Sequence, residues 1–152
     1  MIEFILHPEG TFYLLNLPLE IQSFYKPIFN MILNKTQSFF SITFTDKEVS
    51  LILSLEQFER YFKNYEIIYD NICVSEIYKG FLVTTKIPGL NEVGILSELS
   101  NLFSSYEIPI LNLSTYLGNY IFYPEYDEDK FLRMIENNKN VKIYLQLEKE
   151  VF

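Results

Sequence analysis

The sequence contains few of the residues on which catalytic and metal sites depend. Among its 152 residues there are one histidine, His7, one cysteine, Cys73, and no tryptophan. The chain has no second histidine and no second cysteine, so His7 lacks the further side chains that a metal site or a nucleophile–base pair needs. A single thiol excludes a disulfide within the chain, which is typical of proteins in a reducing compartment. Cys73 lies in the apolar stretch NICV, and we expect it to be buried.

Positive charge is also scarce. The chain has 12 lysines and arginines against 20 acidic residues, a net charge of −8, and only two arginines. Nucleic-acid binders gain most of their affinity from basic side chains, so we expect no nucleic-acid partner and no anionic membrane partner. No apolar run reaches the roughly 18 to 20 residues that span a bilayer. The start, MIEFILHPEG, lacks the basic segment of a secretory signal, which favours a cytoplasmic location.

Glycine and acidic residues occur, but not in the spacings of known cofactor sites. The five glycines form neither a P-loop nor a Rossmann pattern. The acids Glu125, Asp127, Glu128 and Asp129 do not match a calcium-binding EF-hand loop, and capping of a helix explains them better. We therefore expect no catalytic residues, no metal and no cofactor.

Hydrophobic residues make up 49% of the chain and aromatic residues 17%, which is enough for a sizeable core. In the first half, the patterns predict strands over residues 3–6 and 11–17, with a turn at His7-Pro8-Glu9-Gly10 between them. A helix is predicted from Pro18, kinked or shortened at Pro27. Further predicted elements are a hairpin over residues 38–53, a helix over residues 55–61 and a strand over residues 65–69.

The second half repeats this order. The predicted elements are a long strand over residues 73–85, a helix with Asn91 as its N-cap, strands over residues 108–115 and 120–123 around a Gly118-Asn119 turn, a helix from Asp127 or Glu128, and a strand over residues 141–147. Each half therefore reads βαββαβ, the ferredoxin-like arrangement of a four-stranded antiparallel sheet with two helices on one face. The sequence predicts an α+β protein of two such units packed side by side, residues 1–70 and 71–152.

Two segments of the second half could together hold a small ligand. In GLNEVG, residues 89–94, two glycines flank Glu92 at the start of a predicted helix, where unpaired backbone N–H groups can hold a carboxylate. The second segment is the predicted turn that contains Ser114, Thr115, Tyr116 and Asn119. An amino acid would fit, with Glu92 near its ammonium group and Asn119 near its side chain. Alternatively, the glycines only form a turn and Asn119 is only a hairpin residue.

These segments resemble a known family. GLNEVGIL at residues 89–96, EIPILNLSTY at 107–116 and YIFYPE at 120–125 are similar to the ACT domains of the CASTOR-type cytosolic arginine sensors and of small prokaryotic ACT proteins. FFSIT at residues 39–43 and EVSLIL at 48–53 resemble a hairpin of the same family. The resemblance covers nearly the whole chain, as a tandem pair of ACT units.

The resemblance implies a small ligand, usually an amino acid, held between ACT units. The residues that it assigns to ligand binding are Gly89, Glu92, Gly94, Ile95, Thr115, Tyr116 and Asn119. The arginine sensors have an aspartate at the position of Asn119, and an amide lacks the charge that roughly doubles the strength of such a hydrogen bond. This substitution favours a neutral amino acid over arginine. The sensors also carry four ACT units, so a homodimer of this chain would rebuild the larger assembly.

The resulting prediction is a non-enzymatic regulatory or sensor protein of the tandem ACT type, which binds an amino acid and reports it allosterically to a protein partner. The alternative is a ligand-free module for dimerisation or protein interaction, with tyrosine and phenylalanine supplying the contact area. An enzyme on this scaffold is a third possibility, which the lack of a base–nucleophile pair disfavours.

Overall fold

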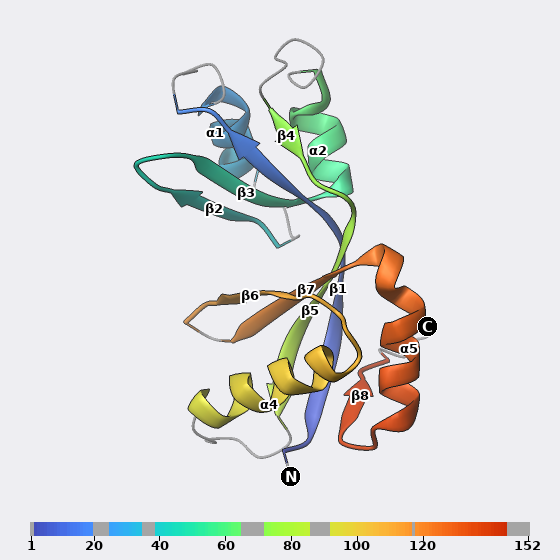
Figure 1. Cartoon of the computed structure of the whole chain (residues 1–152). Coiled ribbons are helices and arrows are strands. Elements are labelled where there is room, and N and C mark those ends of the chain that lie inside the picture. Colours follow the sequence, from blue (N-terminus) through green and yellow to red (C-terminus); the bar gives the residue numbers. More distant parts are fainter. Residues whose placement is uncertain are drawn as a thin grey trace, which may run out of the picture. The chain divides into compact units, whose positions relative to one another are not determined.

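Strand β1, Phe4–Leu17, takes part in both of the units into which the chain divides (Figure 1). The computed structural model describes residues 2–19, 25–34, 39–64, 72–85, 92–116 and 118–145, with the backbone alone for residues 92 and 93. We call Gly10–Tyr78 the first unit, and Met1–Glu9 together with Lys79–Phe152 the second unit. This division differs from the predicted boundaries, 1–70 and 71–152, because the beginning of the chain joins the second unit.

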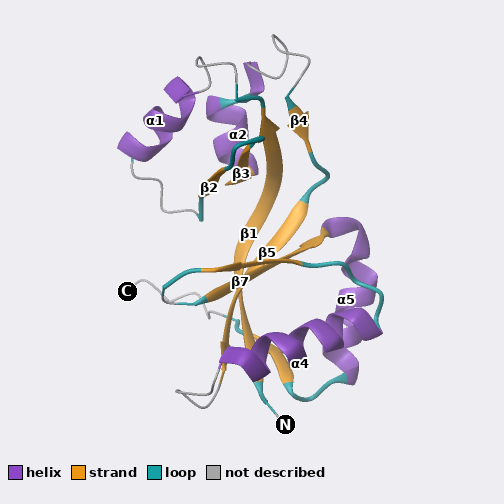
Figure 2. Ribbon diagram, turned by 60° about the vertical axis from the view of Figure 1, so that its left-hand side comes forward, coloured by secondary structure: helices purple, strands orange, loops and turns teal. Residues whose placement is uncertain are grey.

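The first unit has the predicted βαββαβ order. Along the chain, β1 is followed by α1 (Tyr25–Leu33), β2 (Ser41–Phe44), β3 (Val49–Ser54), α2 (Leu55–Tyr61) and β4 (Cys73–Val74). The strands lie in the order β2-β3-β1-β4, and neighbouring strands are antiparallel. Helices α1 and α2 contact each other and pack on the same face of this sheet (Figure 2). This arrangement confirms the ferredoxin-like prediction for the first unit.

The second unit repeats the order and adds a strand. Its elements are β5 (Tyr78–Thr85), α4 (Glu92–Ser105), β6 (Leu111–Ser114), β7 (Asn119–Pro124), a 3-10 turn (Glu125–Asp127), α5 (Glu128–Asn137) and β8 (Val141–Ile143). The strands lie in the order β6-β7-β5-β1-β8, so the beginning of β1 separates β5 from β8. It pairs with β8 in parallel, with Phe4 opposite Val141. The prediction of a purely antiparallel, four-stranded sheet is therefore wrong here, because β1 supplies a further strand.

The turn predicted at His7-Pro8-Glu9-Gly10 is also wrong, because β1 continues through these residues. Before them, β1 pairs with β8 in the second unit; after them, it pairs with β3 in the first unit, from Phe12 to Leu17. Pro8, Glu9 and Gly10 are exposed, and Gly10 has a φ of 115°, which a glycine adopts without strain. These residues therefore mark the passage of one strand between two units rather than a reversal of the chain.

The long strand predicted over residues 73–85 is divided into β4 and β5. Ser75, between them, accepts a hydrogen bond from Leu14 N at 2.9 Å through its side chain, and its own N–H donates to Leu14 O at 2.9 Å. The two strands then serve different units, which no local pattern reveals. Other predicted features, the strand over residues 65–69 and the N-cap Asn91, lie outside the described residues.

Each unit has its own apolar core. In the first unit the buried side chains are Leu15, Leu17, Ile28, Met31, Val49, Leu51, Leu53, Phe58, Phe62 and Ile72. In the second unit they are Phe4, Leu6, Phe81, Val83, Ile95, Leu99, Phe103, Ile108, Ile121, Tyr123, Phe131, Met134 and Val141. The strand residues of these two cores alternate along β3 and β5, as expected for a sheet that buries one face under helices. In β7, Phe122, whose side chain points to the opposite face, is buried as well.

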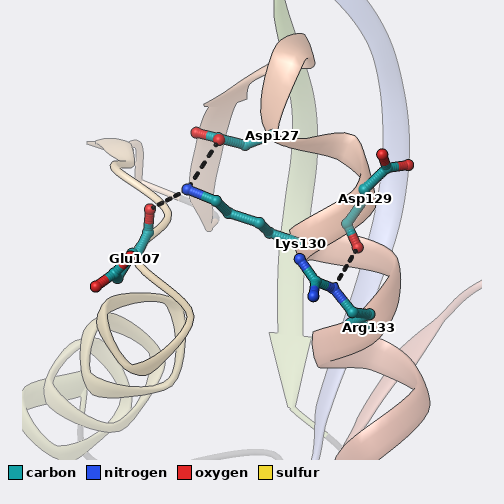
Figure 3. Close-up of polar contacts among 5 residues, drawn as sticks. All are labelled: Glu107, Asp127, Asp129, Lys130 and Arg133. Atoms are coloured by element: carbon teal, nitrogen blue, oxygen red, sulfur yellow. Dashed lines mark hydrogen bonds and ion pairs between the residues drawn. The ribbon is translucent and has the colours of Figure 1, made fainter.

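Helix α4 ends in a Schellman motif that contains a strained residue. Ile108 N donates to Phe103 O at 3.1 Å and Glu107 N donates to Ser104 O at 2.9 Å, the bond pair that defines the motif. Glu107 has a φ of 56°, a left-handed conformation that glycine usually supplies. Lys130 of α5 donates to Glu107 O at 3.3 Å and pairs with Asp127 at 3.4 Å, so it ties the end of α4 to the start of α5 (Figure 3).

We expect Glu107→Gly to raise the free energy of unfolding by about 0.5–1 kcal/mol. The left-handed conformation costs a residue with a Cβ roughly 1–2 kcal/mol, and the larger conformational entropy that glycine loses on folding offsets part of this gain. Chemical denaturation measures the change. Glu107→Ala is the control: it removes the same exposed carboxylate but keeps the Cβ, and should give no comparable gain. A glycine variant less stable than the wild type would contradict the interpretation.

Candidate functional site

The residues predicted to bind a ligand lie on two elements of the second unit. Glu92, Gly94 and Ile95 belong to the first turn of α4, whereas Thr115, Tyr116 and Asn119 belong to the connection between β6 and β7 and to the start of β7. In both views, the first turn of α4 and the β6–β7 turn lie on the same side of the second unit (Figures 1 and 2). Gly89 and the side chain of Glu92 lie outside what the structure describes.

Gly94 and Ile95 are neighbours with opposite surroundings. Gly94 is exposed, and a Cβ added to it would meet, outside its own helix, no atom of the described residues within 4 Å. Glycine within a helix lowers the stability of the protein by about 1 kcal/mol relative to alanine. Close packing of a neighbour would be one reason for glycine at such a position, but none is found at Gly94 among the described residues. Ile95 is only 8% exposed and belongs to the core of the second unit. Of this pair, Gly94 is therefore the residue that faces open space.

Thr115 closes the β6–β7 turn. Its backbone N–H donates to Gly118 O at 2.8 Å, and its hydroxyl oxygen accepts from Gly118 N at 3.2 Å. Gly118 lies close to Leu82: an added Cβ would be 2.9 Å from Leu82 Cδ1, so the leucine side chain would have to shift. Tyr116 is fully exposed at the end of this turn. The turn is therefore held by its own hydrogen bonds, and it presents Tyr116 to solvent.

Asn119 lies opposite Ser114 across the β6–β7 pair. Ser114 Oγ donates to Asn119 Oδ1 at 2.7 Å. Among the described residues, no hydrogen bond involves the Asn119 amide nitrogen. Ser114 is exposed and Asn119 is half-buried, so this pair forms a polar edge beside the turn.

A second polar cluster holds α5 to the sheet. The hydroxyl of Tyr123, a fully buried residue of β7, donates to Glu128 Oε2, and Lys79 Nζ pairs with Glu128 Oε1 at 3.0 Å. Burial raises the pKa of the Tyr123 hydroxyl well above its ordinary value of 10.0, and the hydrogen bond and negative charge of Glu128 raise it further. Tyr123 therefore stays neutral and serves as a hydrogen-bond donor that fixes the first turn of α5.

Two further polar contacts lie near residue 127, one to an acidic side chain and one to a backbone oxygen. Asp127, which is 5% exposed, pairs with Lys130, and Arg133 Nε donates to Asp129 O at 3.4 Å (Figure 3). Among the described residues, no group of three or more His, Cys, Asp or Glu side chains is arranged to hold a metal ion. Within the same residues, no helix has the length and apolar character needed to cross a membrane.

One hollow of the first unit was not anticipated. Cys73 is exposed rather than buried, so that prediction is wrong. It lies opposite Asn16, which lies opposite Ser50, and the three share the sheet face that the helices do not cover. With Glu48, whose carboxylate accepts a hydrogen bond from Asn16, they line a hollow of about 280 Å³. The alternation of these polar positions with buried Leu15, Val49 and Leu51 was a detectable signal in the sequence.

No protein-family model and no curated protein matches the sequence. Solved structures do match the fold. Protein Atu0741 from Agrobacterium tumefaciens has a TM-score of 0.64 at 19% identity, over 99% of this chain and 98% of its own. A putative C-terminal regulatory domain of aspartate kinase from Porphyromonas gingivalis has a TM-score of 0.54 at 12% identity, over 90% and 96%. Aspartate kinase from Clostridium acetobutylicum, an allosteric enzyme, gives 0.56 at 16% identity, over 86% of this chain and 33% of that enzyme.

These similarities, at identities below 20%, concern the fold. The chain has the tandem ACT-type fold, with two ferredoxin-like units, and the α+β class predicted from the sequence is confirmed. The match to an isolated regulatory domain covers nearly the full length of both chains, whereas the match to the whole kinase covers one third of that enzyme.

Proposed function

We propose that this protein is a non-enzymatic regulatory protein that binds an amino acid, or a similar small zwitterion, at the side of the second unit formed by the first turn of α4 and the β6–β7 turn. The observation that carries the proposal is Gly94. It lies in the first turn of a helix, beside open space, where neither packing nor helix stability favours glycine. A missing side chain at this position lets a ligand approach the backbone.

The chemistry of this side suits the carboxylate of an amino acid. The first backbone N–H groups of α4 lack partners within the helix, and together with the helix dipole they favour a carboxylate. Asn119 contributes an amide nitrogen that can donate to a ligand oxygen, because its oxygen already accepts from Ser114. Neutral groups at Asn119 favour an uncharged or carboxylate-bearing side chain over the guanidinium of arginine, which can only donate.

Regulation would follow from linkage. A ligand that binds one arrangement of the chain more tightly than another shifts the population towards it, and a protein partner that distinguishes the arrangements reads the change. The tandem ACT-type fold supports this proposal, since one similar structure is described as a regulatory domain and another as an allosteric enzyme. Amino-acid binding, the protein partner and the cytoplasmic location belong to the proposal.

The test is a thermal-shift screen of the full chain against the twenty amino acids, followed by calorimetry on those that raise the melting temperature. Binding to the native state alone stabilises the fold by about 2.7 kcal/mol at a ligand concentration 100 times the Kd. We expect one amino acid, or a small chemically related set, to give a clear shift. The absence of any shift at millimolar concentrations would refute amino-acid binding.

A ligand-free interaction module is the second candidate. It is favoured by large exposed side chains, among them Tyr116, fully exposed, and Tyr126, 70% exposed. A protein that shows no ligand response but associates with another protein through these surfaces would support this function instead.

A further inference from the structure

Helix α1 has apolar side chains on two opposite sides. Pro27, Ile28 and Met31 are buried against the first unit. On the opposite side, Phe29 is 60% exposed, Ile32 54% and Leu33 76%. Their spacing of i, i+3 and i+4 places them on one stripe, which we call the outer face of α1. A helix on the surface normally has polar side chains on its solvent side, so an apolar outer face that the described residues leave exposed is a candidate interaction surface.

This surface extends beyond the helix. Tyr25, at the start of α1, lies with its ring centre 6.4 Å from that of Phe44 in β2, and Phe44 is itself 55% exposed. Since an aromatic side chain offers roughly 200 Å², the outer face and Phe44 together present on the order of 400 Å² of apolar surface. Two such surfaces together present on the order of 800 Å², the size of a weak, reversible interface rather than of an obligate one.

The lack of charge on this surface favours a second copy of the chain as its binding partner. The whole chain carries a net charge of −8, so two copies repel wherever acidic side chains meet. Helix α1, with the sequence YKPIFNMIL, contains no acidic residue, and its one charged residue is Lys26. The outer face is therefore a place where two copies can meet without burying like charges, and its apolar, charge-poor composition matches the core of homodimer interfaces.

We propose that two copies of this protein associate through the outer face of α1, with the two helices antiparallel about a two-fold axis. Such an interface is self-complementary, because the same surface serves both partners. In this arrangement Lys26, at the start of one helix, lies beside the carboxyl end of the other, where the helix dipole favours a positive charge. The axis passes near Phe29, the middle of α1, which brings Phe29 of the two copies together.

The test is the oligomeric state of the full chain by analytical ultracentrifugation, without added amino acids, so that its outcome is independent of ligand binding. We expect the wild type to be a dimer at about 50 µM. Phe29→Lys and Phe29→Glu should each weaken dimerisation by about 30-fold or more, the effect of losing a central contact. Mixing the two variants in equal amounts should restore a dimer, because opposite charges then meet at the axis.

The matched control is Leu132→Lys. Leu132 is exposed to 49% on α5, in the second unit, and its replacement adds the same charge without touching α1; it should leave the dimer intact. Circular dichroism of each variant establishes that it is folded, and the restored dimer of the mixture does so independently. A monomeric wild type, Phe29 variants that remain dimeric, or folded variants that fail to pair when mixed would each overturn the proposal.

Discussion

Replacement of Phe131 by alanine is expected to lower the free energy of unfolding by about 3–5 kcal/mol, the range typical of a large aromatic side chain in a core. Phe131 is 1% exposed and is the aromatic residue of α5 that meets the sheet and α4 together. Its ring centre lies 4.4 Å from that of Tyr123, 5.3 Å from that of Phe81 and 6.2 Å from that of Phe103. Truncation removes this contact area and leaves a cavity among three rings that cannot collapse freely.

Chemical denaturation followed by far-ultraviolet circular dichroism measures this loss. The control is Leu132→Ala, one residue further along α5, where the side chain is about half exposed; its effect should stay within about 0.5 kcal/mol, as for most surface substitutions. A loss below about 1 kcal/mol for Phe131→Ala would contradict the described core, because removal of a buried ring with three aromatic neighbours lowers the free energy of unfolding by more than that.

The second large effect is expected at Gly94. Gly94→Leu should abolish or weaken amino-acid binding by more than tenfold, because its side chain would occupy the open space that the proposed ligand needs. The same substitution should leave the fold intact and raise its stability by up to about 1 kcal/mol, since leucine favours the helix more than glycine does. Calorimetry with the amino acid found by screening measures the affinity, and chemical denaturation measures the stability.

Gly94 is informative because the two readouts move in opposite directions. The matched control, Ser100→Leu, places the same side chain at an exposed position further along α4 and should leave the affinity unchanged. Unchanged affinity in Gly94→Leu would remove the first turn of α4 from the ligand site. Loss of stability in the same variant would show instead that the glycine serves the fold.

The sequence predicted an element correctly where contacts between neighbouring residues fix its start and its length. Helix α2 was predicted over residues 55–61 and is found at Leu55–Tyr61. Ser54 accepts a hydrogen bond from Gln57 N, and the side chain of Gln57 accepts one from Ser54 N, a capping box that sets the start of the helix. The hairpin of β2 and β3 and the start of α5 at Glu128 follow equally local patterns.

The candidate site is less predictable because helix α4 carries more apolar residues than it can bury. The sequence analysis placed Ile95 among ligand-binding residues through the family resemblance. In the structure Ile95, Leu99 and Phe103 form the buried stripe, at 8%, 1% and 0% exposure. Periodicity alone cannot choose between overlapping stripes on such a helix, since the choice depends on which sheet residues face it. Whether Gly94, Thr115, Tyr116 and Asn119 bind a ligand remains a prediction.

The order of strands and helices was present in the sequence, because alternation, helical spacing and capping act over neighbouring residues. The sequence did not reveal the strands with which β1 pairs. Pro8 and Gly10 look like a turn in isolation, yet β1 passes straight through them, with one end beside β8 and the other beside β3. Which strands pair, and on which face Cys73 or Ile95 lies, depends on contacts between residues far apart in the chain, and such contacts leave no mark in a local pattern.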